Sequence, residues 1–116
     1  MRFVLALALL PTCVFADGFD VLEDDTALTH DEVLNLTYGH SLSFYEGGKS
    51  RYSVGGAYSY SYQSGATAFG HFEVQPDGKV CVTFVNGRTR CDRFVRSHGR
   101  LVLLTQDGGR FPVRPR

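Results

Sequence analysis

The 116-residue sequence lacks an apolar run long enough to cross a lipid bilayer. A membrane-spanning helix needs about 20 predominantly apolar residues. The apolar run that begins at Phe3 is soon followed by the charged and turn-forming residues 17–20, and no later segment is more apolar. This absence predicts a chain without a membrane span.

The sequence also lacks an excess of charge of one sign, because 12 Lys and Arg residues balance 12 Asp and Glu residues. The charges are unevenly placed: acidic residues dominate up to Glu46, and eight arginines lie from Arg88 to Arg116. Such asymmetry is typical of anion-binding proteins, or of two chain ends that compensate each other in one domain. We favour compensation, because Asp92 interrupts the arginines, and we expect nucleic acid not to be a partner.

Metal-ligand spacings are absent as well. A structural zinc site needs four ligands, which usually come in close-spaced pairs. The two cysteines after the N-terminal region stand ten residues apart, without a second pair or a histidine couple. The histidines are scattered along the chain, at His30, His40, His71 and His98. We expect neither a metal nor another cofactor.

Catalytic signatures are missing too. There is no Gly-x-Ser-x-Gly elbow. The segment 47–50 ends like a phosphate-binding loop, but Ser43 stands where that motif needs glycine, and a strand follows instead of a helix. The carboxylate pairs 24–25 and 31–32 fall in a leader and a helix cap, where solvation or capping explains them. We predict no catalytic residues and a protein that is not an enzyme.

The chain begins with the pattern of an export signal. Arg2 precedes an apolar core from Phe3 to Leu10, and residues 14–16 end on the small residue Ala16. Residues 1–16 are therefore predicted to be a signal peptide that is cleaved after Ala16. The product is expected to be periplasmic or secreted, with about 100 residues, the usual size of one domain.

Two cysteines remain after cleavage, Cys81 and Cys91, and an oxidising compartment favours a disulfide between them. Opposed residues of a hairpin must share a face, so the turn decides whether this bond can form. A two-residue turn at Asn86-Gly87 would place Val82 opposite Cys91 and forbid it. A three-residue loop, residues 85–87 with Gly87 in the left-handed conformation, places the cysteines opposite each other.

The remaining chain divides into a leader, a helix and a series of strands. Residues 17–27 are acidic and without periodicity, and we expect a flexible leader. Thr29 and Glu32 form a capping box for a helix over residues 30–38, which Gly39 ends. Strands are predicted at 41–46, 50–54, 57–63, 67–74, 79–85, 88–95, 100–105 and 110–114.

The connections between these strands are too short for parallel crossovers, which need a dozen or more residues. Residues 28–116 are therefore predicted to form a single, mainly β domain. We expect an antiparallel meander that curls into a strongly curved sheet or small barrel, with the helix over an opening or face.

Three tyrosines lie on one face of the strand predicted at 57–63. Tyr58, Tyr60 and Tyr62 alternate with Ser59 and Ser61. Exposed rings of this kind suit stacking on sugars or nucleobases. The alternative is that the rings line a half-buried sheet face while the serines face water. Both interpretations remain open at this point, although the second is the more common.

Several motifs stand in a recognisable order: Leu28-Thr29-x-Asp31-Glu32, a short helix ending in Gly39, Tyr52, Gly70-His71-Phe72-Glu73-Val74, Asp77-Gly78-Lys79-Val80-Cys81, and Asn86-Gly87 followed by Cys91. This order resembles small exported proteins of alphaproteobacteria that are filed as domains of unknown function. The resemblance covers most of residues 28–114, with Phe72 where those proteins usually have tryptophan. It implies a periplasmic β domain with a disulfide, and no catalytic residues.

Three functional hypotheses follow. The first is a non-enzymatic binding or interaction module that uses the tyrosine face or the concave side of the sheet. The second is a purely structural envelope protein. The third is an inhibitor of an extracellular hydrolase such as lysozyme, with Arg88, Arg90 and the His98 loop entering an acidic cleft. The candidate partners are a periplasmic protein or a saccharide, and we expect a monomer.

Overall fold

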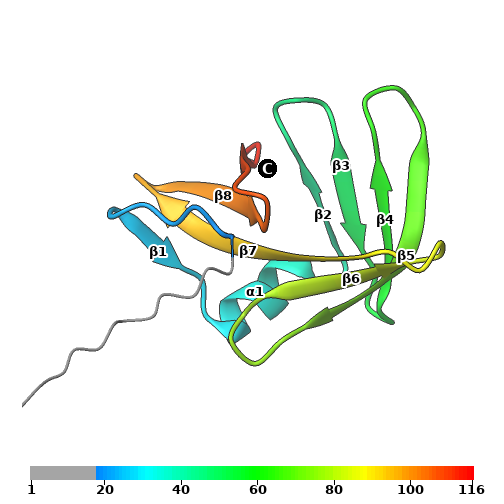
Figure 1. Cartoon of the computed structure of the whole chain (residues 1–116), viewed down its shortest axis with the longest axis horizontal. Helices are drawn as coiled ribbons and strands as arrows, with labels where there is room; N and C mark the ends of the chain where they lie inside the picture. Colours follow the sequence, from blue (N-terminus) through cyan, green and yellow to red (C-terminus); the bar gives the residue numbers. More distant parts are fainter. Residues whose placement is uncertain (1–17) are drawn as a thin grey trace, which may run out of the picture.

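The computed structural model of the protein describes residues 18–116 (Figure 1). The export signal over residues 1–16 and the cleavage site after Ala16 lie outside the described residues. No helix within residues 18–116 has the length and apolar content that a membrane crossing needs.

The described chain forms one antiparallel sheet and one short helix, which confirms the mainly β prediction. The elements in chain order are β1 (Asp25–Ala27), α1 (His30–Thr37), β2 (His40–Ser43), β3 (Lys49–Tyr52), β4 (Ala57–Ser61), β5 (Thr67–Val74), β6 (Val80–Phe84), β7 (Thr89–Ser97), β8 (Arg100–Thr105) and β9 (Arg110–Pro112). Strands β2 to β9 follow one another in the sheet as they do in the sequence, and β1 pairs with β7.

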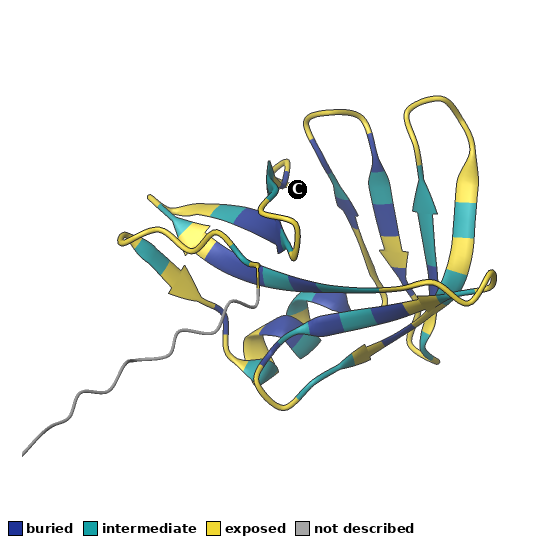
Figure 2. Cartoon of the chain, in the orientation of Figure 1, coloured by how far each residue is buried: buried dark blue, intermediate teal, exposed yellow. Residues whose placement is uncertain are grey.

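The sheet curls into a half-barrel in which the last part of β2 meets the chain that follows β9. An isolated bridge joins Phe44 to Val113, and the amide of Arg114 donates to the carbonyl of Ser43 at 2.7 Å. Because each strand of a meander reverses direction, every second turn lies at the same end. The turns 44–48, 62–66, 85–88 and 106–109 therefore share one end, which we call the mouth. They are mostly exposed (Figure 2).

Helix α1 lies at the end opposite the mouth, where it contacts β2 and β5. Both hydrogen bonds of the Thr29–Glu32 capping box are present, and Gly39 is left-handed with φ 77°, as the sequence predicts. Val33 and Thr37 are buried, and Val33 packs into the core cluster that contains Leu28. The rest of that cluster comes from the concave faces of the strands, chiefly Leu42, Tyr52, Tyr58, Phe72, Val80, Val82, Phe94 and Leu103.

The disulfide and its hairpin are confirmed. Cys81 and Cys91 lie directly opposite each other, with 4.0 Å between their Cα atoms and 2.04 Å between their sulfurs. The loop has three residues, since the Phe84 amide donates to the Arg88 carbonyl at 2.8 Å, and Gly87 has φ 89°. Val82 then opposes Arg90 on the concave face. The disulfide lies on the convex face, outside the core.

The segment expected to be a flexible leader differs from that prediction. Residues 25–27 form β1, which pairs with the last part of β7. Phe19 packs on Val95, Val102 and Leu104, which form a second cluster on the opposite side of the sheet from the main core. The order comes from partners distant in sequence, so local periodicity carried no sign of it.

Candidate functional site

The three tyrosines of β4 and the turn after it lie along the concave face from core to mouth. Tyr58 is 2% exposed, Tyr60 is half-buried, and Tyr62 is 51% exposed. The half-buried-face interpretation therefore describes Tyr58, whereas Tyr62 presents an open ring. Tyr60 and Tyr62 meet edge to face, with 4.9 Å between ring centroids.

Tyr58 belongs to a buried polar network. Its hydroxyl hydrogen-bonds to the Ser50 hydroxyl at 3.0 Å and accepts from Nη2 of Arg90 at 3.0 Å. Burial raises the pKa of Tyr58, and the positive charge of Arg90 opposes this shift. Tyr58 thus joins strands β3, β4 and β7 beneath the mouth and has no face left for a ligand.

Arg90 and Asp92 form the charged part of this network. Nε of Arg90 donates to Oδ1 of Asp92 at 3.0 Å and Nη2 donates to Oδ2 at 2.9 Å, while the Asp92 side chain is fully buried. Burial raises the pKa of the Asp92 carboxyl against the pull of Arg90. The Arg90 side chain turns inward, and its guanidinium carbon lies 5.6 Å from the centre of the Phe84 ring.

Sequence reasoning missed Asp92 as a site residue. The available signal was the Arg90-x-Asp92 spacing, which places both side chains on the same face of a strand. A carboxylate on the concave face of a curled sheet needs a cationic partner, and the neighbour two residues earlier supplies it.

Tyr60 is held by Glu46 from the first mouth turn. Its hydroxyl donates to Oε2 of Glu46 at 3.0 Å, and the Gly48 amide donates to Oε1 of Glu46 at 2.8 Å. Burial, followed by the Glu46 hydrogen bond, raises the pKa of Tyr60. A Cβ at position 48 would lie 1.8 Å from the Tyr60 hydroxyl, so only glycine leaves room for this ring.

A second glycine sets the close approach of β5 and β6. A Cβ on Gly70 would lie 2.3 Å from the Thr83 carbonyl oxygen. Gly70 stands between Tyr58 and Phe84 in the sheet, and those two rings meet edge to face across it at 6.0 Å. The missing side chain thus allows the aromatic floor of the mouth to form.

An open hollow lies at the mouth, and we call it the mouth hollow. Its larger part, of about 620 Å³, is lined by Tyr62, Thr67, Ala68, Phe69, Phe84, Val85, Asn86, Arg88, Thr89 and Arg90. A smaller part, of about 180 Å³, is lined by Phe44, Glu46, Ser50, Tyr60, Tyr62, Arg90, Leu103, Thr105 and Phe111. The two parts share Tyr62 and Arg90.

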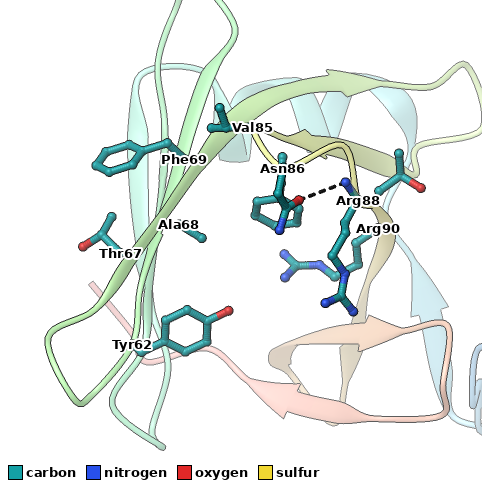
Figure 3. A pocket seen from close by; sticks show the side chains of 10 residues that line it. Tyr62, Thr67, Ala68, Phe69, Val85, Asn86, Arg88 and Arg90 are labelled. Atoms are coloured by element: carbon teal, nitrogen blue, oxygen red, sulfur yellow. Dashed lines mark hydrogen bonds between the residues drawn. The ribbon is translucent and has the colours of Figure 1, made fainter.

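Figure 3 shows how the larger part is arranged. Tyr62 and Ala68 face the hollow from one side, and Asn86, Arg88 and Arg90 face it from the other. Phe69 points away from it, in agreement with its 60% exposure on the convex face.

The structure does not bring His98 to this site. His98 lies in the turn after β7, at the other end of that strand from Arg88, and its Nε2 lies 3.6 Å from Oδ2 of Asp24. At about 3.3 Å per residue, the two side chains start roughly 30 Å apart. Arg88 and Arg90 share one surface, which does not include His98.

Within residues 18–116, no three His, Cys, Asp or Glu side chains are grouped so as to hold a metal ion. Comparison of the chain with protein-family models, with curated proteins and with solved structures found no match. The resemblance to exported alphaproteobacterial proteins therefore stays a prediction.

Proposed function

We propose that the protein is an exported, non-enzymatic binding module that holds a small ligand, most simply a saccharide, in the mouth hollow. The Cys81–Cys91 disulfide supports a location in the periplasm or outside the cell, because such bonds persist in oxidising compartments. The N-terminal export pattern supports the same location.

The mouth hollow itself carries the proposal. Ligand sites are concave, largely pre-formed and often lie at the mouths of β-barrels, with apolar walls and a few polar groups. The hollow combines the open ring of Tyr62 with the polar side chains of Asn86 and Arg88. Beneath it, the Tyr58–Arg90–Asp92 network holds the floor in one arrangement. A flat ring beside hydrogen-bonding groups suits the apolar face and the hydroxyl rim of a sugar.

The two other hypotheses receive less support. An inhibitor that inserts Arg88, Arg90 and the His98 loop together would need them on one surface. The two arginines lie at the start of β7, whereas His98 follows the end of that strand. A purely structural role leaves the exposed Tyr62 ring and the hollow around it without a purpose.

The proposal is tested on the protein expressed as its full precursor and purified after export. Glucose, N-acetylglucosamine, glucuronate and their short oligomers are added while backbone amide signals are followed by NMR. We expect shifts at Tyr62, Ala68 and residues 84–90. Tyr62→Ala should weaken binding roughly tenfold, since stacking on one aromatic ring contributes about 1–3 kcal/mol. Tyr58 is unsuitable for this test because it is buried.

Tyr38→Ala is the matched control, because Tyr38 is an exposed tyrosine that follows helix α1 and does not line the hollow. It should leave affinity unchanged. If none of the sugars shifts the hollow signals, or if Tyr62→Ala and Tyr38→Ala behave alike, the saccharide-binding proposal is wrong.

A further inference from the structure

The charges that line the larger part of the mouth hollow are unequal. Two arginines line it, Arg88 and Arg90, and none of its lining residues is acidic. The charge of Arg90 is already balanced by Asp92, with 2.9 Å between Nη2 and Oδ2. Arg88 is exposed, and within residues 18–116 its guanidinium has no carboxylate within ion-pair distance. The larger part of the hollow therefore carries one uncompensated positive charge on its wall, whereas the Glu46 carboxylate lines the smaller part and accepts from the Tyr60 hydroxyl.

The hairpin around Arg88 is held in place by local bonds. Oδ1 of Asn86 accepts from the Arg88 amide at 2.9 Å, which leaves the side-chain NH2 of Asn86 to donate into the hollow (Figure 3). The three-residue loop and the disulfide behind it fix the position of Arg88 directly before β7. Arg88 is thus presented by a braced turn, so little backbone ordering is needed when an anion binds.

The opposite wall supplies apolar and neutral groups. Tyr62 faces the hollow with an open ring, and Ala68 leaves space beside it. A volume of about 620 Å³ lies within the range of small-molecule sites, roughly 300–1,000 Å³. The hollow thus has room for one or two sugar rings between the two walls.

We propose that the ligand is a sugar that carries a carboxylate. This inference rests on the proposed function and names its ligand class. The Arg88 guanidinium pairs with the carboxylate, the Tyr62 ring packs on the apolar face of the sugar, and the Asn86 amide donates to a ring hydroxyl. Arginine suits this role because its planar fork matches the two oxygens of a carboxylate.

The test compares sugars that differ only in this group. Binding of glucuronate and of glucose is measured by calorimetry and by amide shifts, at about 20 mM and about 200 mM salt. Charge interactions are weakly screened at the lower concentration and strongly screened at the higher one. We expect glucuronate to bind at least about tenfold more tightly than glucose, because a hydrogen bond to a charged group is the stronger kind. Higher salt should reduce this preference.

Arg88→Gln removes the charge and should bring glucuronate to the affinity of glucose. Arg96→Gln is the matched control, because Arg96 is an exposed arginine at the far end of β7 from Arg88 and the change in net charge is identical. It should keep the preference. Both positions are exposed, so neither variant is expected to unfold the protein.

Equal affinity for glucose and glucuronate would overturn this inference, and so would an unchanged preference in Arg88→Gln. Either result, with shifts still centred on Tyr62, leaves the saccharide-binding function intact. Benzoate separates the carboxylate from the sugar, and tighter binding of benzoate than of glucuronate would overturn the sugar part. Failure of the binding function itself shows differently, as an absence of hollow shifts with every sugar.

Discussion

The Arg90–Asp92 pair shows how two residues can depend unequally on each other. Asp92 is fully buried, whereas the Arg90 side chain keeps 30% of its exposure. Without Arg90, the Asp92 carboxylate would be a buried charge with no partner, which is strongly destabilising. Without the Asp92 charge, Arg90 can still turn toward the hollow and water. The burial of Asp92 is therefore the costlier half of the pair.

We expect Arg90→Met to lower the free energy of unfolding at pH 7 by about 3 kcal/mol, the usual cost of leaving one buried partner unpaired. Asp92→Asn should cost about 1 kcal/mol, close to one hydrogen bond. Urea unfolding of both variants checks this order.

The pH dependence separates this cause from simple loss of packing. In Arg90→Met, burial without the arginine raises the pKa of Asp92 further above its unfolded value. Folding then favours the protonated carboxyl, so the loss should shrink as pH falls from 7 to about 4. A defect of equal size at both pH values would contradict the buried-charge explanation.

At position 48 the structure predicts a large effect of one methyl group. A Cβ at Gly48 would lie 1.8 Å from the Tyr60 hydroxyl, so Gly48→Ala should displace the Tyr60 ring and break its hydrogen bond to Glu46. We expect a loss of about 1–3 kcal/mol, the usual cost of overpacking. Gly55→Ala is the control, since no atom lies within 4 Å of its Cβ, and it should stay within about 0.5 kcal/mol of the parent. Thermal unfolding distinguishes the two.

Among the elements, the β6–β7 hairpin uses one face for core packing and the other for the disulfide. Val80 and Val82 pack into the core, while Cys81 and Cys91 join on the convex face. The disulfide therefore ties the two strands together without filling the core. Its contribution to stability comes mainly from restricting the unfolded chain.

We expect the double substitution Cys81→Ser and Cys91→Ser to lower the free energy of unfolding by about 2–3 kcal/mol while the fold is kept. Urea unfolding gives the magnitude, and amide shifts of Val80 and Val82 report on the core. Chemical reduction of the parent should reproduce the same loss. If the amide signals of Val80 and Val82 are lost in the variant before urea is added, the disulfide also shapes the native state.

The short strand β1 is held by one ion pair as well as by its pairing with β7. Nη1 of Arg110 donates to Oδ2 of Asp25 at 2.7 Å, and the Asp25 side chain is fully buried. The Arg110 hydrogen bond is the main reason why the pKa of Asp25 falls to about 2. An unfolded aspartate has a pKa near 3.9. The pair therefore stabilises β1 above about pH 4, and this contribution is lost as pH falls through 2.

We expect Asp25→Asn at pH 7 to speed amide hydrogen exchange in residues 25–28 and to leave the mouth strands unchanged. Lowering the pH of the parent from about 4 to about 2 should weaken β1 in the same way. Glu23→Gln is the control, because Glu23 is an exposed acid of the same segment. Equal exchange in the two variants would show that strand pairing alone holds β1.

For the whole molecule, the separation of charge along the chain is compensated in part in space. The acidic N-terminal segment lies against the arginine-bearing strands, with 2.7 Å between Asp25 and Arg110. Asp77 likewise pairs with Arg93 at 3.4 Å. These contacts agree with the compensation that we favoured from the sequence. Within residues 18–116, Arg88 is among the arginines without a carboxylate partner, and it lines the mouth hollow.

The local pattern of the chain was enough to predict its elements. The capping box at Thr29, the glycine-bearing turns and the alternation within each run predicted α1 and strands β2 to β9. The three-residue loop followed from the requirement that Cys81 oppose Cys91. Strand β1 and the Arg90–Asp92 pair escaped this reasoning, because both depend on how a distant or buried partner is placed.

By itself, the sequence determined which segments become strands, which face of each is apolar and which cysteines meet. Those properties depend on the two-residue period of a strand and on turns of a few residues, so a short segment of sequence is enough to set each of them. Only the tertiary structure decided which tyrosine of β4 and its turn is open, which uncompensated arginine lines the hollow, and where the two meet. The curvature of the sheet brings the turn 62–66 to face the turn 85–88, and curvature arises from the packing of all strands together.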